Sequence, residues 1–223
     1  KDLAKGGQAL PMGVLIRYPD ETRELPEPPD ATRISIRGHR PPPDGVINYA
    51  LVGAGGFGTG MLVPQMKKRK DRFFLRGVVS RGSAASGNFA RENQVEVLTT
   101  DYDQILNDPN FHLVVISTRH DLHADQVVRG LKAGKHVFVE KPLAISWEGL
   151  DQVMQAYSDL AHPPLLLVGF NRRFAPGILA IKAAVKNRRA PLVVNYRLNA
   201  GYLPPDHWVH GPQGGGRNIV ISP

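Results

Sequence analysis

The sequence predicts a doubly wound α/β fold built on a parallel sheet, and two observations support this prediction. From Val46 onward, short continuous apolar runs alternate with segments of helical length, as expected for strand–helix units whose strands are buried on both faces. A glycine-rich loop follows the first apolar run, where sheets of this class turn into their first helix. The predicted strands are Ile47–Val52, Phe74–Val79, Val95–Leu98, Leu113–Ser117, His136–Glu140 and Leu165–Val168.

Helix-length segments separate these strands, and parallel neighbours need such crossover connections. The predicted helices are Gly58–Lys70, Ala84–Asn93, Tyr102–Asn107, Leu122–Ala133 and Trp147–Asp159. The alternation loosens after Gly169, where a helix at Pro176–Lys186 and a strand at Leu192–Arg197 precede a stretch rich in glycine, proline and histidine. We expect this region to be the start of an incomplete α+β domain.

The composition is that of an ordinary globular protein, since 42% of the 223 residues are hydrophobic, 22% are charged and none is cysteine. The lack of cysteine excludes disulfides and thiolate metal sites. No apolar run approaches the roughly 18 residues of a membrane span, and the first residues lack the apolar core of a signal peptide. The sequence therefore favours a cytoplasmic protein with no membrane partner.

The formal net charge of +8 raises the question of a nucleic-acid partner. The basic residues are scattered except for the run 67–70, which closes a predicted helix, where cations suit the negative end of the helix dipole. Aromatic residues make up only 7% of the chain, and no groove-reading motif occurs. We expect no nucleic-acid partner, and a polyanion-binding patch at 67–70 is the weaker alternative.

The loop after the first strand fits the pattern G-x-G-x-x-G. Gly53 permits a tight turn, Gly55 lets the backbone approach a pyrophosphate, and Gly58 lets the next helix pack closely on the sheet. The first N–H groups of that helix then face the phosphates. We therefore predict a dinucleotide site that includes Gly53, Gly55, Gly56, Phe57 and Gly58. The alternative is a glycine turn without a ligand.

The end of the second strand bears on which dinucleotide binds. An acid about twenty residues past the loop would accept from the ribose 2′-hydroxyl of NAD, but the sequence has Ser80, Arg81 and Ser83 there. The serines can donate to a phosphate, and the arginine can pair with it and stack on adenine. NADP is thus the expected cofactor, with NAD less favoured; the alternative is an exposed arginine, with specificity set elsewhere.

Three further motifs complete a resemblance. They are Thr118-Arg119-His120-Asp121-Leu122-His123, Glu140-Lys141-Pro142 and Gly169-Phe170-Asn171-Arg172-Arg173-Phe174. Together with the glycine loop, they resemble the glucose–fructose oxidoreductase/inositol dehydrogenase (Gfo/Idh/MocA-like) family from about Ile47 to Arg217. The resemblance implies a Rossmann domain followed by a mostly antiparallel second domain, and hydride transfer between a nicotinamide and a sugar- or polyol-like small-molecule substrate.

The resemblance also implies roles for single residues. Lys141 would reach the substrate and assist proton transfer, as a lysine with a lowered pKa can; the alternative is a surface lysine paired with Glu140. For His123, two interpretations are equally supported: a residue at the start of a helix whose hydrogen bonds are formed locally, and a residue that contacts the cofactor. The remaining residues implied at the cofactor are Thr118, His120, Glu140, Pro142, Asn171 and Arg172. No metal site is expected, because the histidines lack a ligand spacing.

The carboxy-terminal residues depart from the family pattern. His207–His210 and Gly214–Arg217 resemble the approach to the family's second catalytic motif, but its histidine is missing from the residues 218–223 that follow. A catalytically inactive dinucleotide-binding fragment is therefore the alternative to an NAD(P)-dependent oxidoreductase. A homo-oligomer is a further expectation, although family dimers associate through the sheet of the second domain.

These observations divide the chain into four expected parts. Residues 1–20 would be a remnant of a preceding domain, since Gly13–Tyr18 resembles the last strand of a zinc-type alcohol dehydrogenase domain. Residues 21–45 would be a proline-rich linker, 46–168 the dinucleotide-binding Rossmann domain and 169–223 the truncated start of the substrate domain. Because the chain begins with Lys1 and stops at Pro223, we expect a fragment or a processed piece.

Overall fold

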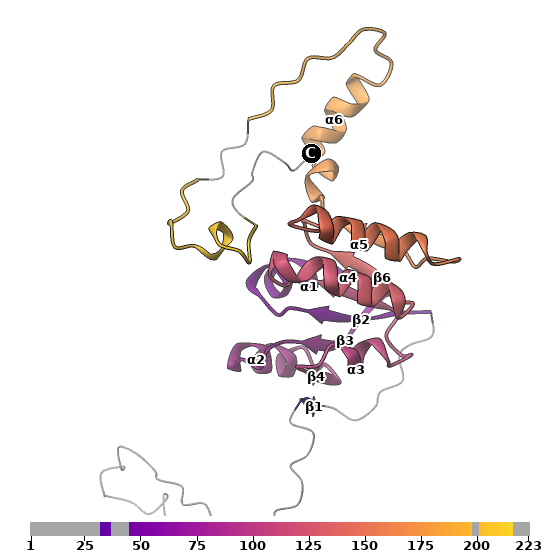
Figure 1. Cartoon of the computed structure of the whole chain (residues 1–223), viewed down its shortest axis with the longest axis vertical. Helices are drawn as coiled ribbons and strands as arrows, with labels where there is room; N and C mark the ends of the chain where they lie inside the picture. The colour runs from indigo at the N-terminus through magenta and orange to yellow at the C-terminus, as the bar shows by residue number, and fades with distance from the viewer. Residues whose placement is uncertain (1–31, 37–44, 198–200, 216–223) are drawn as a thin grey trace, which may run out of the picture. The chain divides into compact units, whose positions relative to one another are not determined.

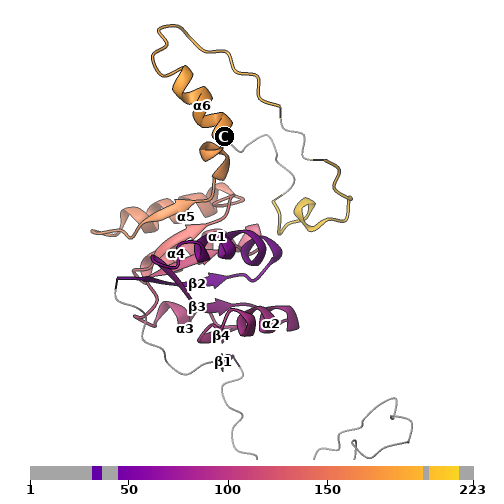
Figure 2. The ribbon, with the colours of Figure 1, turned by 180° about the vertical axis from the view of Figure 1, so that it is seen from behind.

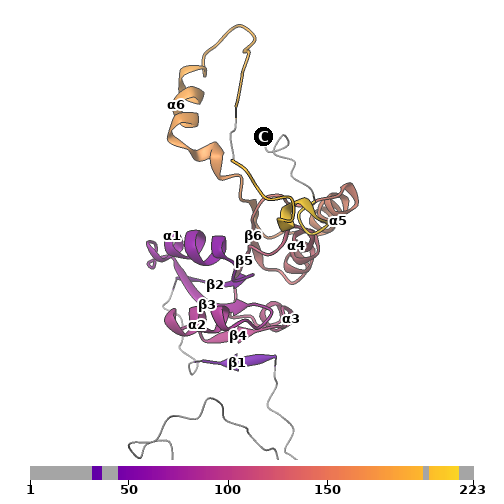
Figure 3. The same cartoon turned by 90° about the vertical axis from the view of Figure 1, so that its left-hand side faces the viewer.

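A computed structural model describes residues 32–36, 45–197 and 201–215 of the chain (Figure 1). Its centre is a seven-stranded sheet in the order β1-β4-β3-β2-β5-β6-β7, and Figure 3 shows the labels β1 to β6 in this succession. All neighbouring strands run parallel except β1, which pairs antiparallel with β4. The strands are β1 (Arg33–Ser35), β2 (Ile47–Val52), β3 (Phe73–Val79), β4 (Val97–Thr99), β5 (Leu113–Ile116), β6 (His136–Val139) and β7 (Leu166–Val168).

Helices connect the parallel strands, so the predicted doubly wound α/β fold is confirmed. A π-helical turn, η1 (Gly58–Leu62), leads into α1. The other helices each begin and end within two residues of the predicted limits. The α-helices are α1 (Val63–Lys67), α2 (Ala84–Glu92), α3 (Asp103–Leu106), α4 (His123–Lys132), α5 (Trp147–Ser158) and α6 (Pro176–Ala184), and the 3-10 turns are η2 (His120–Leu122), η3 (Asn171–Phe174) and η4 (Trp208–His210).

Alternation along β2 divides the core between the two faces of the sheet. Tyr49 and Leu51 pack in a cluster that contains Val63 of α1 and Ala90 of α2. Ala50 and Val52 join the cluster on the other face, to which α3, α4 and α5 contribute. Successive side chains of a strand point to opposite faces, so each face of β2 is covered by its own set of helices; Figure 2 shows the sheet from behind.

Two predictions about irregular regions were wrong. The strand predicted at Leu192–Arg197 does not form, and Val193 is 95% exposed there. A strand needs a neighbour for its backbone groups, and none of the described residues pairs with this segment. Conversely, Arg33–Ser35 of the predicted linker form β1, because β4 offers them an open edge. The strand-like segment Met12–Ile16 lies outside the described residues.

No helix within the described ranges is both long and apolar enough to cross a membrane.

Candidate functional site

The site predicted from the glycine loop lies at the carboxyl edge of the sheet. Because β2, β3, β5, β6 and β7 are parallel, the turns that follow them leave from this one edge. From β2, the chain first adds β3 and β4 on one side and then adds β5, β6 and β7 on the other side. The order of strand addition therefore reverses between β2 and β5. In open α/β sheets, ligands bind beside such a switch point. The loop at Gly53 and the turn at Ser117 flank it.

The first turn of the glycine loop is fixed to two neighbouring strands. The Gly53 N–H donates to the Val79 carbonyl oxygen at 2.9 Å, and the Ser117 hydroxyl donates to the Gly53 carbonyl oxygen at 2.7 Å. Gly53 has a φ of +91°, and a Cβ on it would lie 2.8 Å from the Thr118 backbone nitrogen. Both the conformation and the closeness of the turn after β5 therefore require glycine at this position.

Gly58 fixes the first helix to the same turn. It is buried, and a Cβ on it would collide with the Ser117 hydroxyl and come within 3.2 Å of the Leu51 side chain. The helix consequently approaches the sheet more closely than any larger residue would allow. This is the packing role that the sequence predicts for the last glycine of the motif.

Gly55 and Gly56 differ from these two, because the protein itself gives no reason for glycine there. Both are exposed, neither has a positive φ, and beyond its chain neighbours a Cβ on either would meet no atom of the described residues within 4 Å. Phe57, the next residue, has a ring that is 45% exposed. The bare backbone at Gly55 and Gly56 leaves room for a group that must approach it closely, as a pyrophosphate does.

The residues after β3 are arranged around the start of α2. The Ser80 N–H donates to the Thr99 carbonyl oxygen, and Arg81 is exposed and forms no ion pair with any described residue. Ser83 caps α2: its hydroxyl accepts from the Ser86 N–H, and the Ser86 hydroxyl accepts from the Ser83 N–H. This cap was not predicted, although serine is one of the preferred residues at a helix start; the usual partner three residues later is Glu or Gln, and here it is Ser86.

His123 connects the turns that follow β5 and β6. It is fully buried, with Nδ1 2.7 Å from the Pro142 carbonyl oxygen and Nε2 3.3 Å from that of Thr118. A neutral imidazole has one N–H, so the shorter contact is its hydrogen bond. Because both nitrogens face backbone oxygens, neither is left to contact a cofactor, and His123 instead positions the two turns. Thr118 itself donates from its hydroxyl to Gln126 Oε1 at 2.7 Å.

Burial of His123 should make the stability of the chain depend on pH. Desolvation is the main cause that lowers the pKa of His123 below its usual value, partly opposed by the nearby carbonyl oxygens of Pro142 and Thr118, which favour the protonated ring. The unfolded state therefore binds a proton at a higher pH than the folded state. We expect the free energy of unfolding to fall as the pH drops below about 6.5, by at most about 1.4 kcal/mol per pH unit for one histidine.

Urea unfolding of a His123→Gln variant at pH 7 and pH 5 tests this expectation, with the exposed His162→Gln as the matched control. The loss of stability at low pH should shrink in the first variant and persist in the second. Equal pH dependence in His123→Gln and the wild type would show that His123 does not contribute.

Glu140, Lys141 and Pro142 form the turn after β6. The Lys141–Pro142 peptide bond is cis. The Glu140 carboxyl is buried beside Gly169, where a Cβ would lie 2.8 Å from Glu140 Oε1. Desolvation raises the pKa of Glu140, and the Lys141 N–H and charge oppose this rise. Lys141 is exposed and makes no ion pair within the described ranges, so its amine extends from the turn rather than pairing with Glu140.

Asn171 and Arg172 lie in η3, directly after the turn at Gly169. Both are exposed, and the Asn171 N–H donates to the Gly169 carbonyl oxygen at 2.8 Å. The structure therefore places them in the segment that leaves the carboxyl edge from β7. It records no side-chain hydrogen bond or ion pair between them and the turn at Lys141 in the described residues.

The segment 201–215 contacts the turn after β5, an arrangement that no feature of the sequence predicts. The Trp208 ring packs edge-on against His120, with centroids 4.9 Å apart, and the Arg119 guanidinium lies 4.2 Å above the Trp208 ring. His120 Nδ1 is 3.0 Å from the Gly214 carbonyl oxygen. Burial chiefly lowers the pKa of His120; its hydrogen bond to Gly214 raises it, and the charge of Lys141 lowers it further.

The remaining histidines of this segment supply no metal site. His207 Nδ1 accepts from the Val209 N–H, and His210 is exposed. Across the described residues, no group of three or more His, Cys, Asp or Glu side chains could hold a metal ion.

Comparison with known proteins agrees with this geometry. Residues 47–162 match the Gfo/Idh/MocA model, described as an oxidoreductase family with an NAD-binding Rossmann fold. The oxidoreductase YrbE of Bacillus subtilis, whose function is uncharacterized, is 32% identical over 142 residues, which are 63% of this chain and 40% of YrbE. Inositol 2-dehydrogenase of Salmonella typhimurium is 32% identical over 130 residues, covering 57% of this chain and 38% of that enzyme.

A solved structure gives the same result. The WlbA dehydrogenase of Chromobacterium violaceum, in complex with NADH and UDP-GlcNAcA, superposes with a TM-score of 0.60 at 25% identity, over 69% of this chain and 44% of WlbA. This chain thus spans less than half the length of each of these three relatives. The family match covers more than half of this chain, and it includes the glycine loop and the Glu140-Lys141-Pro142 turn. The chain therefore belongs to the Gfo/Idh/MocA family of oxidoreductases with an NAD-binding Rossmann fold.

Proposed function

We propose that this chain binds NADP at the carboxyl edge of its sheet and supports hydride transfer to or from a sugar- or polyol-like substrate. The observation that carries the proposal is the open backbone at Gly55 and Gly56, where the protein has no internal need for glycine. The nicotinamide, when bound, supplies or accepts the hydride. The names of the relatives support the substrate class, since one is an inositol 2-dehydrogenase.

The residues at this edge have separate roles in the proposal. The backbone from Gly53 to Gly58 holds the pyrophosphate, Thr118 and His120 line the cofactor, and Asn171 and Arg172 lie toward the substrate. The exposed Lys141 amine gives a proton to the substrate oxygen or takes one from it. Its backbone is held by the hydrogen bond from His123 to the Pro142 carbonyl and by the buried Glu140 beside Gly169.

The preference for NADP rests on Arg81. Its guanidinium is exposed beside Ser80 and the capped start of α2, with no carboxylate paired to it in the described residues. An unpaired arginine there favours a 2′-phosphate, whereas a ribose hydroxyl would need an acceptor. WlbA was solved with NADH, so the preference must come from these residues and not from the family.

Calorimetric titration with NADP and NAD tests the preference. An Arg81→Ala variant is expected to bind NADP about tenfold or more weakly, the loss of a charge-assisted hydrogen bond of roughly 1.5–3 kcal/mol, and to bind NAD unchanged. Arg91→Ala, which removes the same charge from the exposed side of α2, should change neither affinity. Tighter binding of NAD than NADP by the wild type would overturn the assignment.

Turnover separates the proposed oxidoreductase from a dinucleotide-binding fragment without catalysis. Reduction of NADP is followed by absorbance with a panel of polyols and sugars, and Lys141→Met serves as the negative control. Steady reduction of NADP by the wild type, but not by Lys141→Met, supports hydride transfer assisted by Lys141. Dinucleotide binding without turnover on any substrate would favour the inactive alternative.

A further inference from the structure

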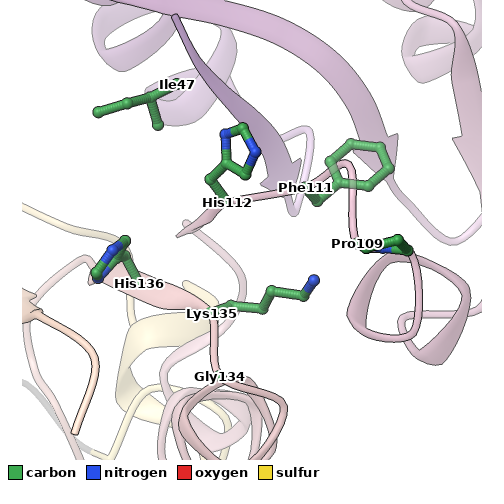
Figure 4. Close-up of a pocket in the computed structure, with 7 residues that line it drawn as sticks. All are labelled: Ile47, Pro109, Phe111, His112, Gly134, Lys135 and His136. Atoms are coloured by element: carbon green, nitrogen blue, oxygen red, sulfur yellow. The ribbon is translucent and has the colours of Figure 1, made fainter. Parts of the chain in front are cut away.

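A cavity of about 410 Å³ opens at the amino edge of the sheet, opposite the edge that carries the glycine loop. Ile47 and His136 are the first residues of β2 and β6, and His112 directly precedes β5. Figure 4 shows Ile47 and His136 on one side of the opening and Pro109 and Phe111 on the other. The lining residues are Ile47, Pro109, Phe111, His112, Gly134, Lys135 and His136.

The polar side chains that line this cavity are hydrogen-bond donors. His112 Nδ1 accepts from the Asn48 N–H at 3.2 Å, and His136 Nδ1 accepts from the Leu165 N–H at 2.9 Å. With Nδ1 occupied as an acceptor, the proton of each neutral ring is on Nε2. Each imidazole therefore offers an N–H and not the free lone pair that a metal ion requires. None of the described residues places a carboxylate side chain in the lining of the cavity.

Lys135 adds a positive charge at the same place. Its side chain is only 7% exposed, and its ammonium donates to the Asp108 carbonyl oxygen at 2.8 Å. An ammonium has three N–H donors, so two remain for another acceptor. Burial lowers the pKa of Lys135, and Asp108 partly opposes this shift. An anion in the cavity would offset the cost of burying the charge.

Asn48 lies next to the cavity but is not among the residues that line it. It is fully buried, and neither its amide nitrogen nor its amide oxygen has a partner among the described residues. Its backbone N–H donates to His112 Nδ1, and its carbonyl oxygen accepts from the His112 N–H. The backbone of β2 therefore holds the His112 ring at the edge of the cavity.

We propose that this cavity binds a small anion, an oxyanion group of the carboxylate or phosphate class, independently of the dinucleotide at the other edge. The Nε2–H groups of His112 and His136 and the Lys135 ammonium hold its oxygens. Phe111, Pro109 and Ile47 provide an apolar wall for the body of an organic anion.

Nuclear magnetic resonance of the full chain, with nitrogen-15 in its histidine rings, tests the proposal directly. Inorganic phosphate and benzoate are titrated separately at constant ionic strength. The Nε2–H signals of His112 and His136 should shift in a saturable way with at least one of them, while the exposed His162 stays unchanged. Saturation by phosphate alone would identify a phosphate site, and saturation by benzoate alone would identify a carboxylate site with an apolar wall.

A Lys135→Met variant keeps the buried stem and removes the charge. It should bind the effective anion about tenfold or more weakly, whereas Lys132→Met, an exposed lysine on the neighbouring helix end, should bind as the wild type does. An equal loss in both variants would show diffuse surface attraction and overturn the proposal. So would the lack of saturable shifts with both anions in the wild type, a result that does not depend on whether a variant folds.

Discussion

Replacing Gly55 by valine should abolish most dinucleotide binding and leave the stability of the chain unchanged. Apart from Gly55 and its two chain neighbours, no atom of the described residues lies within 4 Å of the position of the new Cβ, and the φ of Gly55 is not positive. The added methyl groups would instead occupy the space in which the pyrophosphate approaches the loop. We expect the affinity for NADP to fall by roughly a hundredfold, about 2.8 kcal/mol, with the midpoint of thermal unfolding unchanged.

Calorimetry and thermal melting of the same preparations measure both quantities. Gly60→Val is the matched control, because Gly60 is also exposed with open space around it but lies beyond the loop in η1. Its affinity should stay within about twofold of the wild type. If Gly55→Val bound NADP normally, the open backbone would be no phosphate site, and the proposed function would lose its main support.

The second large effect concerns stability, at the ion pair between Arg76 and Glu96. Their side chains are 3% and 5% exposed and meet at 2.9 Å, and the Glu96 N–H also donates to the Arg76 carbonyl oxygen. Removing Glu96 takes away the carboxylate that offsets the cost of burying the Arg76 guanidinium. Glu96→Ala should therefore lower the free energy of unfolding by about 3–5 kcal/mol, as measured by urea denaturation.

The exposed pair of Arg129 and Asp103 is the control for this prediction. Its atoms are closer, at 2.7 Å, but the side chains are 37% and 58% exposed, so Asp103→Ala should cost at most about 1 kcal/mol. The double variant Arg76→Met/Glu96→Leu should recover most of the loss, since an apolar pair has no charge to bury. A loss below about 1 kcal/mol in Glu96→Ala would mean that solvent or a rearranged Arg76 compensates the charge.

The regular part of the fold could be predicted because local pattern and tertiary structure agree there. Ile47–Val52 is apolar except for Asn48, and it forms β2 with the predicted bounds. Leu192–Arg197 has similar residues but no strand beside it in the described residues, so its pattern alone could not produce a strand. Arg33–Ser35 has little apolar character, and the open edge of β4 decides its conformation.

The candidate site shows the same division. The glycine loop could be identified from its own residues. Gly53 and Gly58 are needed where the backbone passes close to other atoms, and Gly55 and Gly56 leave the backbone open to a ligand. The contact of Trp208 with Arg119 and His120 joins segments almost ninety residues apart, and no spacing in the sequence indicates it. The burial of His123 is likewise a tertiary property, because the same residue at an exposed helix start would be free to reach a ligand.

The short strand β1 also bears on where this domain could be cut. Composition suggests a start at residue 46, after the proline-rich stretch that ends at Pro43. A polypeptide trimmed there would lack Arg33–Ser35 and leave the outer backbone groups of β4 unpaired. Such an edge is a template on which a second molecule can add a strand. A shortened version should therefore keep the residues from Thr32 onward, so that this edge of β4 stays paired, even though most of that stretch has the composition of a linker.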